Sequence, residues 1–270
     1  MRTAELIQAS AFLYFALLAV CLPELRRNKV LAIAAIGLAS ITVATFLLPK
    51  TLATSVIRDW LPAPLMLFVY WQAGQFFQRV DRAAQDLLER TDRHLLPGFL
   101  HWLAHTGTGR VFSGYFELSY LLCYPMIPFA VGALYILRLR PHVDLFWTVV
   151  LTPTYFSYAM LPWIQTIPPR MLDETWDPKA HLLLLRRLNC WLLRNASIHA
   201  NTFPSAHAAS SSGAALAMAY LAPWPVGMAF GALAVGIGFG TFCGRYHYVL
   251  DAIAGSGAAL ACFLLTMRPL

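Results

Sequence analysis

The chain has 270 residues, of which 59% are hydrophobic and only 12% are charged. Soluble domains carry about 25% charged residues, so this composition argues against a soluble enzyme, and the repeated long apolar runs indicate a polytopic membrane protein. The net charge of +7 does not indicate nucleic-acid binding, because no Lys/Arg-rich tract with interleaved aromatics accompanies it; the basic residues are placed to face lipid headgroups. We predict an all-α, polytopic membrane bundle of about six to eight transmembrane helices.

The N-terminal part of the chain contains three predicted spans, at residues 8–23, 30–48 and 60–77. The first is interpreted as an uncleaved helix, because no clear Ala-x-Ala cleavage site follows it. The third is the least regular, with two prolines near its start and two glutamines near its end.

Residues 78–110 follow a different pattern, in which charged side chains alternate with Val and Leu. This pattern predicts an amphipathic helix at the membrane interface. A solvated helix face explains its charges better than a binding role. With the preceding spans it forms an N-terminal part, residues 1–110, of a single membrane domain whose helical core is expected at 111–270.

The fourth and fifth predicted spans, residues 111–137 and 143–164, share a semi-polar stripe of tyrosines. Such a stripe suits a cavity lined for a headgroup, although aromatic residues of the membrane interface explain some of it equally well. The tyrosines are Tyr115, Tyr120, Tyr124, Tyr135, Tyr155 and Tyr158.

The remaining chain has one long polar connection, residues 165–206, and three further predicted spans at about 207–222, 225–243 and 249–267. Small residues at small-xxx-small spacing let these last helices approach closely. The glycines concerned are Gly213, Gly231, Gly236, Gly240, Gly244, Gly255 and Gly257. The five Cys residues form no paired motif and therefore indicate neither a metal site nor a disulfide framework.

The first segment with recognisable chemistry is Asn-Thr-Phe-Pro-Ser-Ala-His at residues 201–207. His207 follows a Pro-Ser corner at which a helix can start. Ser205 is a good N-cap, and the free N–H groups of the first turn form an anion site. Taken alone, His207 is more simply a surface histidine.

The second segment is Gly-Arg-Tyr-His-Tyr-Val-Leu-Asp at residues 244–251. His247 and Asp251 are four residues apart, so on a helix they lie on one face, and the carboxylate can orient the imidazole and raise its basicity. A carboxylate at the edge of a span is costly and indicates function. Taken alone, the pair is equally well a structural contact between helices.

Together the two segments resemble the type 2 phosphatidic acid phosphatase (PAP2) superfamily, and most closely its inositol phosphorylceramide synthase-like (inositolphosphotransferase) branch. The resemblance covers about residues 111–267 and implies a helical core with its motifs on one membrane face. It implies that His247 attacks phosphorus to form a phosphohistidine, that Asp251 orients it, and that His207 protonates the leaving oxygen and then activates water or an acceptor alcohol. Basic residues would bind the phosphate oxygens.

The sequence departs from the superfamily in its charged positions. The first motif is usually a Lys, six residues, then Arg-Pro; here Arg170 is present, but the Lys position is Trp163 and Met171 replaces the Pro. Ala206 replaces the usual Gly before His207, and the Arg expected six residues before His247 is Thr241. The expected phosphate-binding groups are therefore Arg170, Ser205 and Arg245. Lys179, Arg186 and Arg187 could assist or could simply face lipid headgroups.

We therefore expect an integral membrane enzyme, of a bacterial inner (plasma) membrane, that hydrolyses or transfers a phosphate ester of a lipid phosphate or phospholipid. No metal or cofactor is expected, because the chain supplies its own nucleophile and acid. The branch resemblance favours transfer, whereas the small size and the absence of an acceptor domain favour hydrolysis. The alternative from another class is a non-enzymatic membrane scaffold or transporter, which predicts that both histidines are replaceable.

The side of the membrane stays open at this point. With eight spans, most Lys and Arg residues fall on the face that carries the motifs, which predicts a cytoplasmic site. Most members of the superfamily work on the outer or luminal face, and one miscounted span, most easily 60–77, would change the count.

Overall fold

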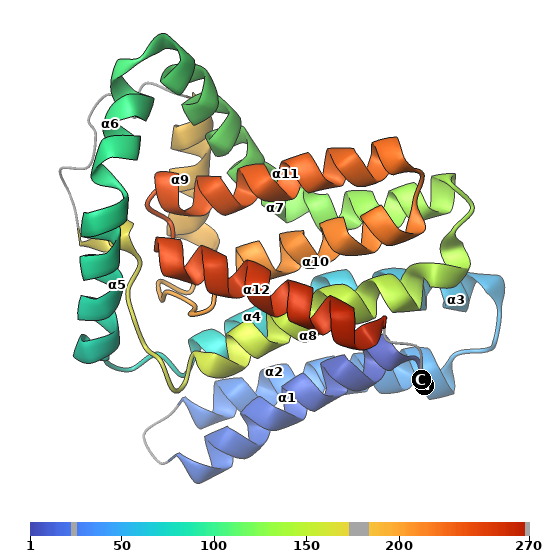
Figure 1. The fold of residues 1–270 in the computed structure, drawn as a ribbon. Coiled ribbons are helices and arrows are strands. Elements are labelled where there is room, and N and C mark those ends of the chain that lie inside the picture. The colour runs from blue at the N-terminus through green and yellow to red at the C-terminus, as the bar shows by residue number, and fades with distance from the viewer. Residues whose placement is uncertain (23–25, 173–183, 268–270) are drawn as a thin grey trace.

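A computed structural model describes residues 1–22, 26–172 and 184–267. Within these residues the chain is helical, and its β-type pairing is limited to one isolated bridge between Thr166 and Asn201. Long helices run roughly side by side along a bundle, and α5 and α6 cross one end of it (Figure 1). The all-α polytopic prediction is confirmed.

Within the described ranges, six helical segments are long and apolar enough to cross a membrane. They are α1 (Thr3–Cys21), α2 with a following π-helical turn (Arg27–Leu47), α3 with α4 (Leu52–Gly74), α7 (Gly107–Ile136), α11 (Trp224–Cys243) and α12 (Val249–Thr266). The other two predicted spans are α8 (Val143–Met160) and α10 (Ala206–Leu221), which do not meet these criteria of length and composition. Both nevertheless lie within the bundle, where α10 packs on α8, α11 and α12.

The third predicted span starts earlier than expected and is interrupted. It consists of α3 (Leu52–Trp60) and α4 (Pro62–Gly74), which begins at a proline. Proline lacks an N–H, so it fits the first turn of a helix but interrupts a continuous one. Together the two helices form one candidate span, Leu52–Gly74.

The prediction of one amphipathic helix over residues 78–110 is wrong in its extent. The structure has α5 (Arg82–Leu95), then α6 (Pro97–His105), and residues 107–110 already belong to α7. Pro97 starts the second helix for the reason given above. The Asp81 side chain caps α5 by accepting from the N–H groups of Ala83 and Ala84.

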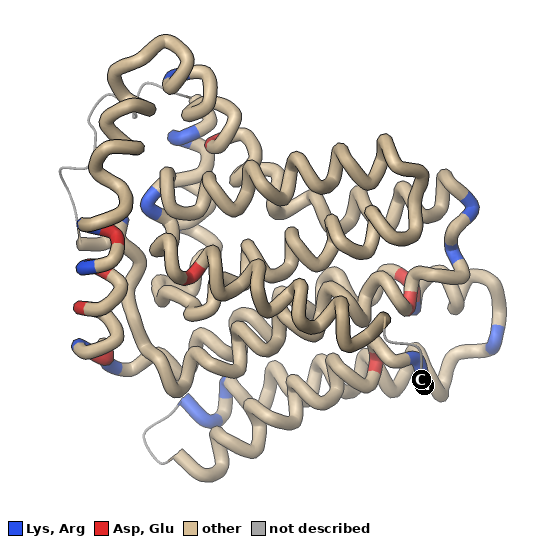
Figure 2. The backbone as a smooth tube through the Cα atoms, viewed as in Figure 1, with Lys and Arg blue, Asp and Glu red and all other residues tan. Residues whose placement is uncertain are grey.

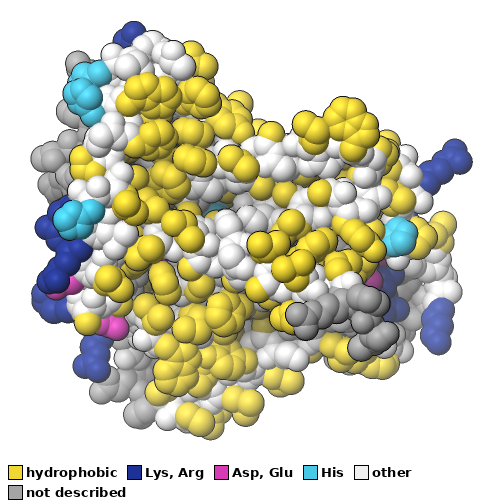
Figure 3. Space-filling view, in the orientation of Figure 1, with side chains coloured by type: hydrophobic (Ala, Val, Ile, Leu, Met, Phe, Trp, Pro, Cys, Tyr) yellow, Lys and Arg dark blue, Asp and Glu magenta, His cyan; other side chains and the backbone are white. Residues whose placement is uncertain are grey.

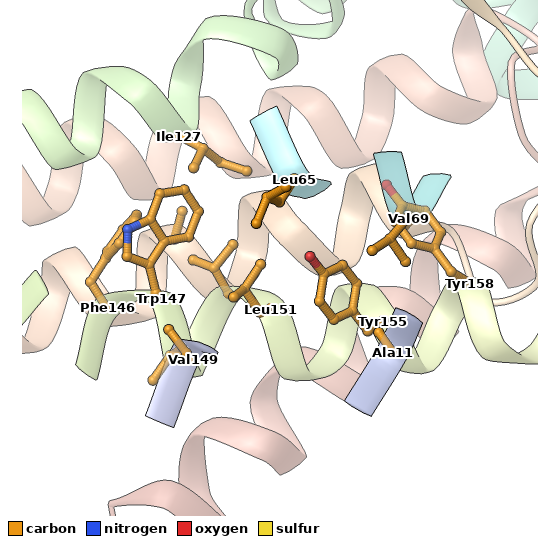
Figure 4. Packing of buried hydrophobic residues seen from close by; sticks show 14 of the residues in the cluster. Ala11, Leu65, Val69, Ile127, Phe146, Trp147, Val149, Leu151, Tyr155 and Tyr158 are labelled. Atoms are coloured by element: carbon orange, nitrogen blue, oxygen red, sulfur yellow. The ribbon is translucent and has the colours of Figure 1, made fainter. Parts of the chain in front are cut away.

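The hydrophobic core is centred on α8. Trp147, Leu151 and Tyr155 of this helix pack towards Leu65 of α4 and Ile127 of α7 (Figure 4). Tyr155 and Tyr158 are therefore core residues, so these two tyrosines of the stripe belong neither to a headgroup cavity nor to the membrane interface.

Some of the predicted close helix contacts are made by glycine. An added Cβ at Gly213 would lie 2.8 Å from the carbonyl oxygen of Val149 in α8, and one at Gly240 would lie 2.5 Å from that of Phe116 in α7. Gly231 and Gly257 face open space among the described residues, so not every glycine of the pattern serves packing.

Charged residues gather at the two ends of the bundle, and a broad apolar surface lies between them (Figures 2 and 3). At the end away from α5, ion pairs join Glu5 to Arg58 (2.6 Å) and Asp59 to Arg2 (2.6 Å) and Arg140 (2.7 Å). At the α5 end, α2 begins, α10 begins and α11 ends (Figure 1). This arrangement is typical of an integral membrane protein with its apolar belt in the bilayer.

Candidate active site

The two histidines and the aspartate of the motifs converge at the α5 end of the bundle. The Nδ1 atom of His207 lies 3.2 Å from Nε2 of His247, and Nδ1 of His247 lies 3.4 Å from Oδ2 of Asp251. His207 is in the first turn of α10, Asp251 is in the first turn of α12, and His247 precedes α12. The tertiary structure therefore aligns carboxylate, imidazole and imidazole in one row.

The contact between His247 and Asp251 has a different local cause from the one expected. His247 lies before α12, so the two residues do not share a helix face. Instead, Asp251 Oδ2 accepts the backbone N–H of Tyr248 at 2.9 Å, which fixes the carboxylate at the helix start beside the preceding imidazole. This is the geometry of an N-terminal capping interaction.

The corner before α10 is held by the same helix. Ser205 caps α10 by accepting from the Ala208 N–H at 3.3 Å, and its own N–H donates to the carbonyl oxygen of Asp251 at 2.9 Å. Gly255 faces this corner, where a Cβ would collide with the Ser205 carbonyl oxygen. The absence of a side chain at Gly255 thus lets α12 approach the corner that carries His207.

Burial, together with the positive charge of Arg170, lowers the pKa of His247. The imidazole is therefore neutral at neutral pH. Its Nδ1 faces the buried carboxylate of Asp251, and in the tautomer with the proton on Nδ1 the lone pair on Nε2, directed at His207, is the nucleophile.

Arg170 supplies the positive charge of the site. Its guanidinium donates to the carbonyl oxygen of Tyr246 at 3.2 Å and to the hydroxyl of Ser197 at 3.4 Å. Its backbone N–H donates to the carbonyl oxygen of Arg245 at 2.9 Å. The first and last motifs are thus joined directly, and the charge of Arg170 acts on both histidines.

The other two predicted phosphate-binding side chains have partners within the protein. The Ser205 hydroxyl is buried as the cap of α10. The guanidinium of Arg245 pairs with Asp92 of α5 at 2.9 Å. Lys179 lies outside the described residues.

The side chains at the two positions that lack the superfamily's basic residues do not contribute polar atoms to the row either. Trp163 is exposed and donates to the Tyr14 hydroxyl at 2.8 Å. The Thr241 hydroxyl bonds within α11, to the carbonyl oxygen of Gly238.

Two tyrosines of the stripe surround His207. The ring centroids of Tyr120 and Tyr124 lie 5.4 Å and 6.0 Å from that of the imidazole, and Tyr120 also stacks on Tyr246 at 3.9 Å. Among the described residues the buried Tyr120 hydroxyl has no hydrogen-bond partner. The stripe was the sequence signal for these residues, but only the fold separates Tyr120 and Tyr124 from the core tyrosines.

A buried polar cluster beneath the catalytic loop was not predicted. Glu117 of α7 accepts from Arg186 at 3.0 Å and from Asn189 at 2.8 Å, both on α9 (Leu184–Ala196), and from the Tyr246 hydroxyl at 2.7 Å. Arg186 also donates to the carbonyl oxygen of Gly244. These contacts fix the loop that carries His247. Arg186 therefore has a structural role, which neither of the two interpretations from sequence, phosphate binding or contact with lipid headgroups, had included.

Comparison with known families agrees with this geometry. A family model described as the PAP2 superfamily matches residues 86–265, and the chain belongs to that superfamily. No curated protein and no solved structure matches the chain. Membership of this superfamily supports phosphatase-type activity on lipid phosphates, that is, a phosphoric ester hydrolase or a phosphotransferase.

The close approach at Gly255 leads to a testable prediction. Gly255→Ala is expected to push α12 away from the Ser205 corner, separating Asp251 and His247 from His207, and to lower kcat by about 100-fold, since displacements near 1 Å can have this effect. Gly257→Ala, two residues further on, adds a methyl group in open space and is the matched control. Equal activities of the two variants would contradict the prediction.

Proposed function

We propose that the protein is an integral membrane lipid-phosphate phosphatase or phosphotransferase that acts through a phosphohistidine on His247. The observation that carries the proposal is the row Asp251–His247–His207, in which the two imidazoles face each other at 3.2 Å beside Arg170. A phosphoryl group that binds at this row and displaces the contact between the rings meets the neutral nucleophile His247 and, opposite it, His207. Burial and Arg170 lower the pKa of His207 as well, so His207 acts as the acid only once the negative charge of the bound phosphate raises that pKa.

The reaction is proposed in two steps. His247 Nε2 attacks phosphorus, the bond from phosphorus to the lipid oxygen breaks, and a proton on His207 goes to that oxygen. Asp251 stabilises the imidazole as it gains positive charge. Water or an acceptor alcohol then loses its proton to His207 and attacks phosphorus, and the phosphorus–nitrogen bond breaks.

Charge neutralisation of the phosphate is assigned to few groups. Arg170 is the guanidinium at the row, and the Tyr120 hydroxyl is the nearby neutral donor, whereas the Ala206 and Ala208 N–H groups at the start of α10 already bond to Thr202 and Ser205. Such preorganised donors stabilise the negative charge of the transition state in a site with little water.

Transfer and hydrolysis differ only in the second nucleophile, and the finer proposal is transfer of a phospho-headgroup to an alcohol, as in inositol phosphorylceramide synthases. Its support is the resemblance of the two motif segments and the lack of the phosphatase-type Lys and Arg at Trp163 and Thr241. The test is product analysis of the purified protein with a labelled phospholipid. A labelled lipid product that appears only with an alcohol acceptor supports transfer, and release of labelled phosphate or headgroup regardless of acceptor supports hydrolysis.

The class itself is tested by phosphate release from a panel of lipid phosphates in detergent, beside the transfer assay. Activity that requires His247 supports the proposal. Silence in both assays, or activity unaffected by loss of His247, would favour the scaffold or transporter alternative.

The same geometry predicts which side the site faces. The basic residues at the start of α2 and those of α5 lie at the motif end, so the positive-inside rule predicts a cytoplasmic site. In a bacterial host, green fluorescent protein fused after His105 is expected to fluoresce, and alkaline phosphatase fused after α12 is expected to be active. The opposite pattern would place the site on the outer face.

A further inference from the structure

Helix α5 crosses the motif end of the bundle and is not one of the candidate spans (Figure 1). Its buried side chains are Gln85, Leu88 and Asp92. Two of these three are polar, which is unusual for the inward face of an amphipathic helix, because buried polar groups are stable only with hydrogen-bond partners. Their partners therefore indicate what this helix does.

Asp92 binds the loop that carries His247 at two points. Its Oδ2 accepts from Arg245 Nη1 at 2.9 Å, and its Oδ1 accepts from the backbone N–H of Val249 at 3.0 Å. These two residues flank His247, two positions away on either side. Arg245 has a backbone φ of 56°, in the left-handed region that is unfavourable for a side-chain-bearing residue, so the loop conformation needs external support.

Gln85, two turns earlier in the same helix, binds the segment before Arg170 and the segment that carries His247. Its Nε2 donates to the Tyr248 hydroxyl, and its Oε1 accepts from the Ile167 N–H at 3.0 Å. The Tyr248 hydroxyl in turn donates to the Ile167 carbonyl oxygen at 3.1 Å. Gln85 thus ties the segment leading to Arg170 to the residue that follows His247.

We propose that Gln85 and Asp92 are positioning residues, which hold the His247 loop and the Arg170 segment against each other from the membrane surface. The inference rests on the proposed function and adds a role for a helix whose charges the sequence explains as a solvated face. Neither residue touches the row of His and Asp side chains, so both act through the backbone that they hold.

The charge state of Asp92 sets the conditions of the test. Burial raises the pKa of Asp92 to about 6, with the nearby Asp251 adding to the rise, while the Val249 N–H and Arg245 oppose it. Assays at about pH 7.5 therefore examine the ionised, ion-paired form.

The matched variants are Asp92→Asn and Asp86→Asn, on the same helix. Asp86 is exposed, with a side-chain exposure of 63% and only a 4.0 Å contact with Arg90. Asp92→Asn is expected to lower kcat by about 100-fold with KM unchanged, because the nucleophile is displaced while substrate contacts remain. Asp86→Asn is expected to match the wild type. Gln85→Met, which keeps the side-chain length and loses the amide hydrogen bonds to Tyr248 and Ile167, is expected to lower kcat in the same way.

Amide hydrogen exchange of the same proteins in detergent gives a readout that needs no substrate. In Asp92→Asn, exchange is expected to accelerate in residues 244–252 and at 165–170, and to stay unchanged in the bundle helices. Accelerated exchange throughout the chain would make Asp92 a general stability contact and overturn the proposal. A raised KM with normal kcat would also overturn it, because Asp92 and Arg245 would then act on substrate binding.

The positioning role of α5 and the proposed catalytic function can be contradicted independently of each other. If His247→Ala is inactive while Asp92→Asn has normal kcat and normal exchange, the proposed function stands and the positioning role is wrong. If the wild type has no activity on any substrate but Asp92→Asn shows the local acceleration of exchange, the loop-holding role stands and the catalytic function is wrong.

Discussion

His247→Ala is expected to abolish turnover, with a fall in kcat of at least about 1,000-fold, since loss of a covalent nucleophile removes the reaction path itself. His247 is the buried histidine whose Nε2 faces the second imidazole while its Nδ1 faces Asp251. The measurement is phosphate or headgroup release from the preferred lipid at neutral pH. Rapid quenching with a labelled substrate should also trap label on the wild-type protein and none on the variant.

His94→Ala is the matched control, because His94 is an exposed histidine on α5 at the same end of the bundle. It is expected to leave activity within about twofold of the wild type, as surface substitutions usually do. If label is still trapped on His247→Ala, the nucleophile is another residue. Normal turnover of His247→Ala would contradict a mechanism through a phosphohistidine on His247.

His207→Gln is expected to separate the two chemical steps. With an aryl phosphate, whose leaving oxygen needs little protonation, His247 should still be phosphorylated, but the phosphoenzyme should persist because no base activates the second nucleophile. Rapid-mixing measurements should then show a burst of aryl alcohol equal to the amount of enzyme, followed by turnover at least about 100-fold slower than the wild type.

The same variant should respond differently to a lipid phosphate. An alkyl oxygen is a poor leaving group without a proton, so the burst should disappear and the first step should become limiting. A full steady-state rate with either substrate would show that His207 is not the acid and base. A burst with both substrates would assign the leaving-group proton to another residue.

Among the described residues, few cations are placed at the proposed site. Arg245, which sequence comparison offered as a phosphate ligand, is ion-paired with Asp92, and Ser205 is engaged as a helix cap. Arg170 remains at the row, beside the neutral donor of the Tyr120 hydroxyl. In a buried site one charge acts strongly, because the local dielectric constant is low.

The amphipathic segment shows where sequence reasoning was limited. Alternating charge and Leu indicated an amphipathic helix, and the structure has two shorter helices there, α5 and α6. The same pattern fits both a helix with a fully solvated polar face and a helix whose inward face carries two polar residues. Asp86 and Asp92 are indistinguishable in sequence, although one is exposed and the other is buried against Arg245. Only the position of α5 relative to the catalytic loop separates them.

The amino-acid sequence by itself determined the membrane class, the helical architecture, the motif segments and the helix start at Ser205, because hydropathy, periodicity and capping are local properties of the chain. Only the tertiary structure decided that His207 and His247 face each other, that Arg245 turns to Asp92, and that Tyr120 rather than Tyr155 lies at the site. These contacts join residues tens of positions apart, and their geometry depends on the packing of helices, which no local pattern specifies.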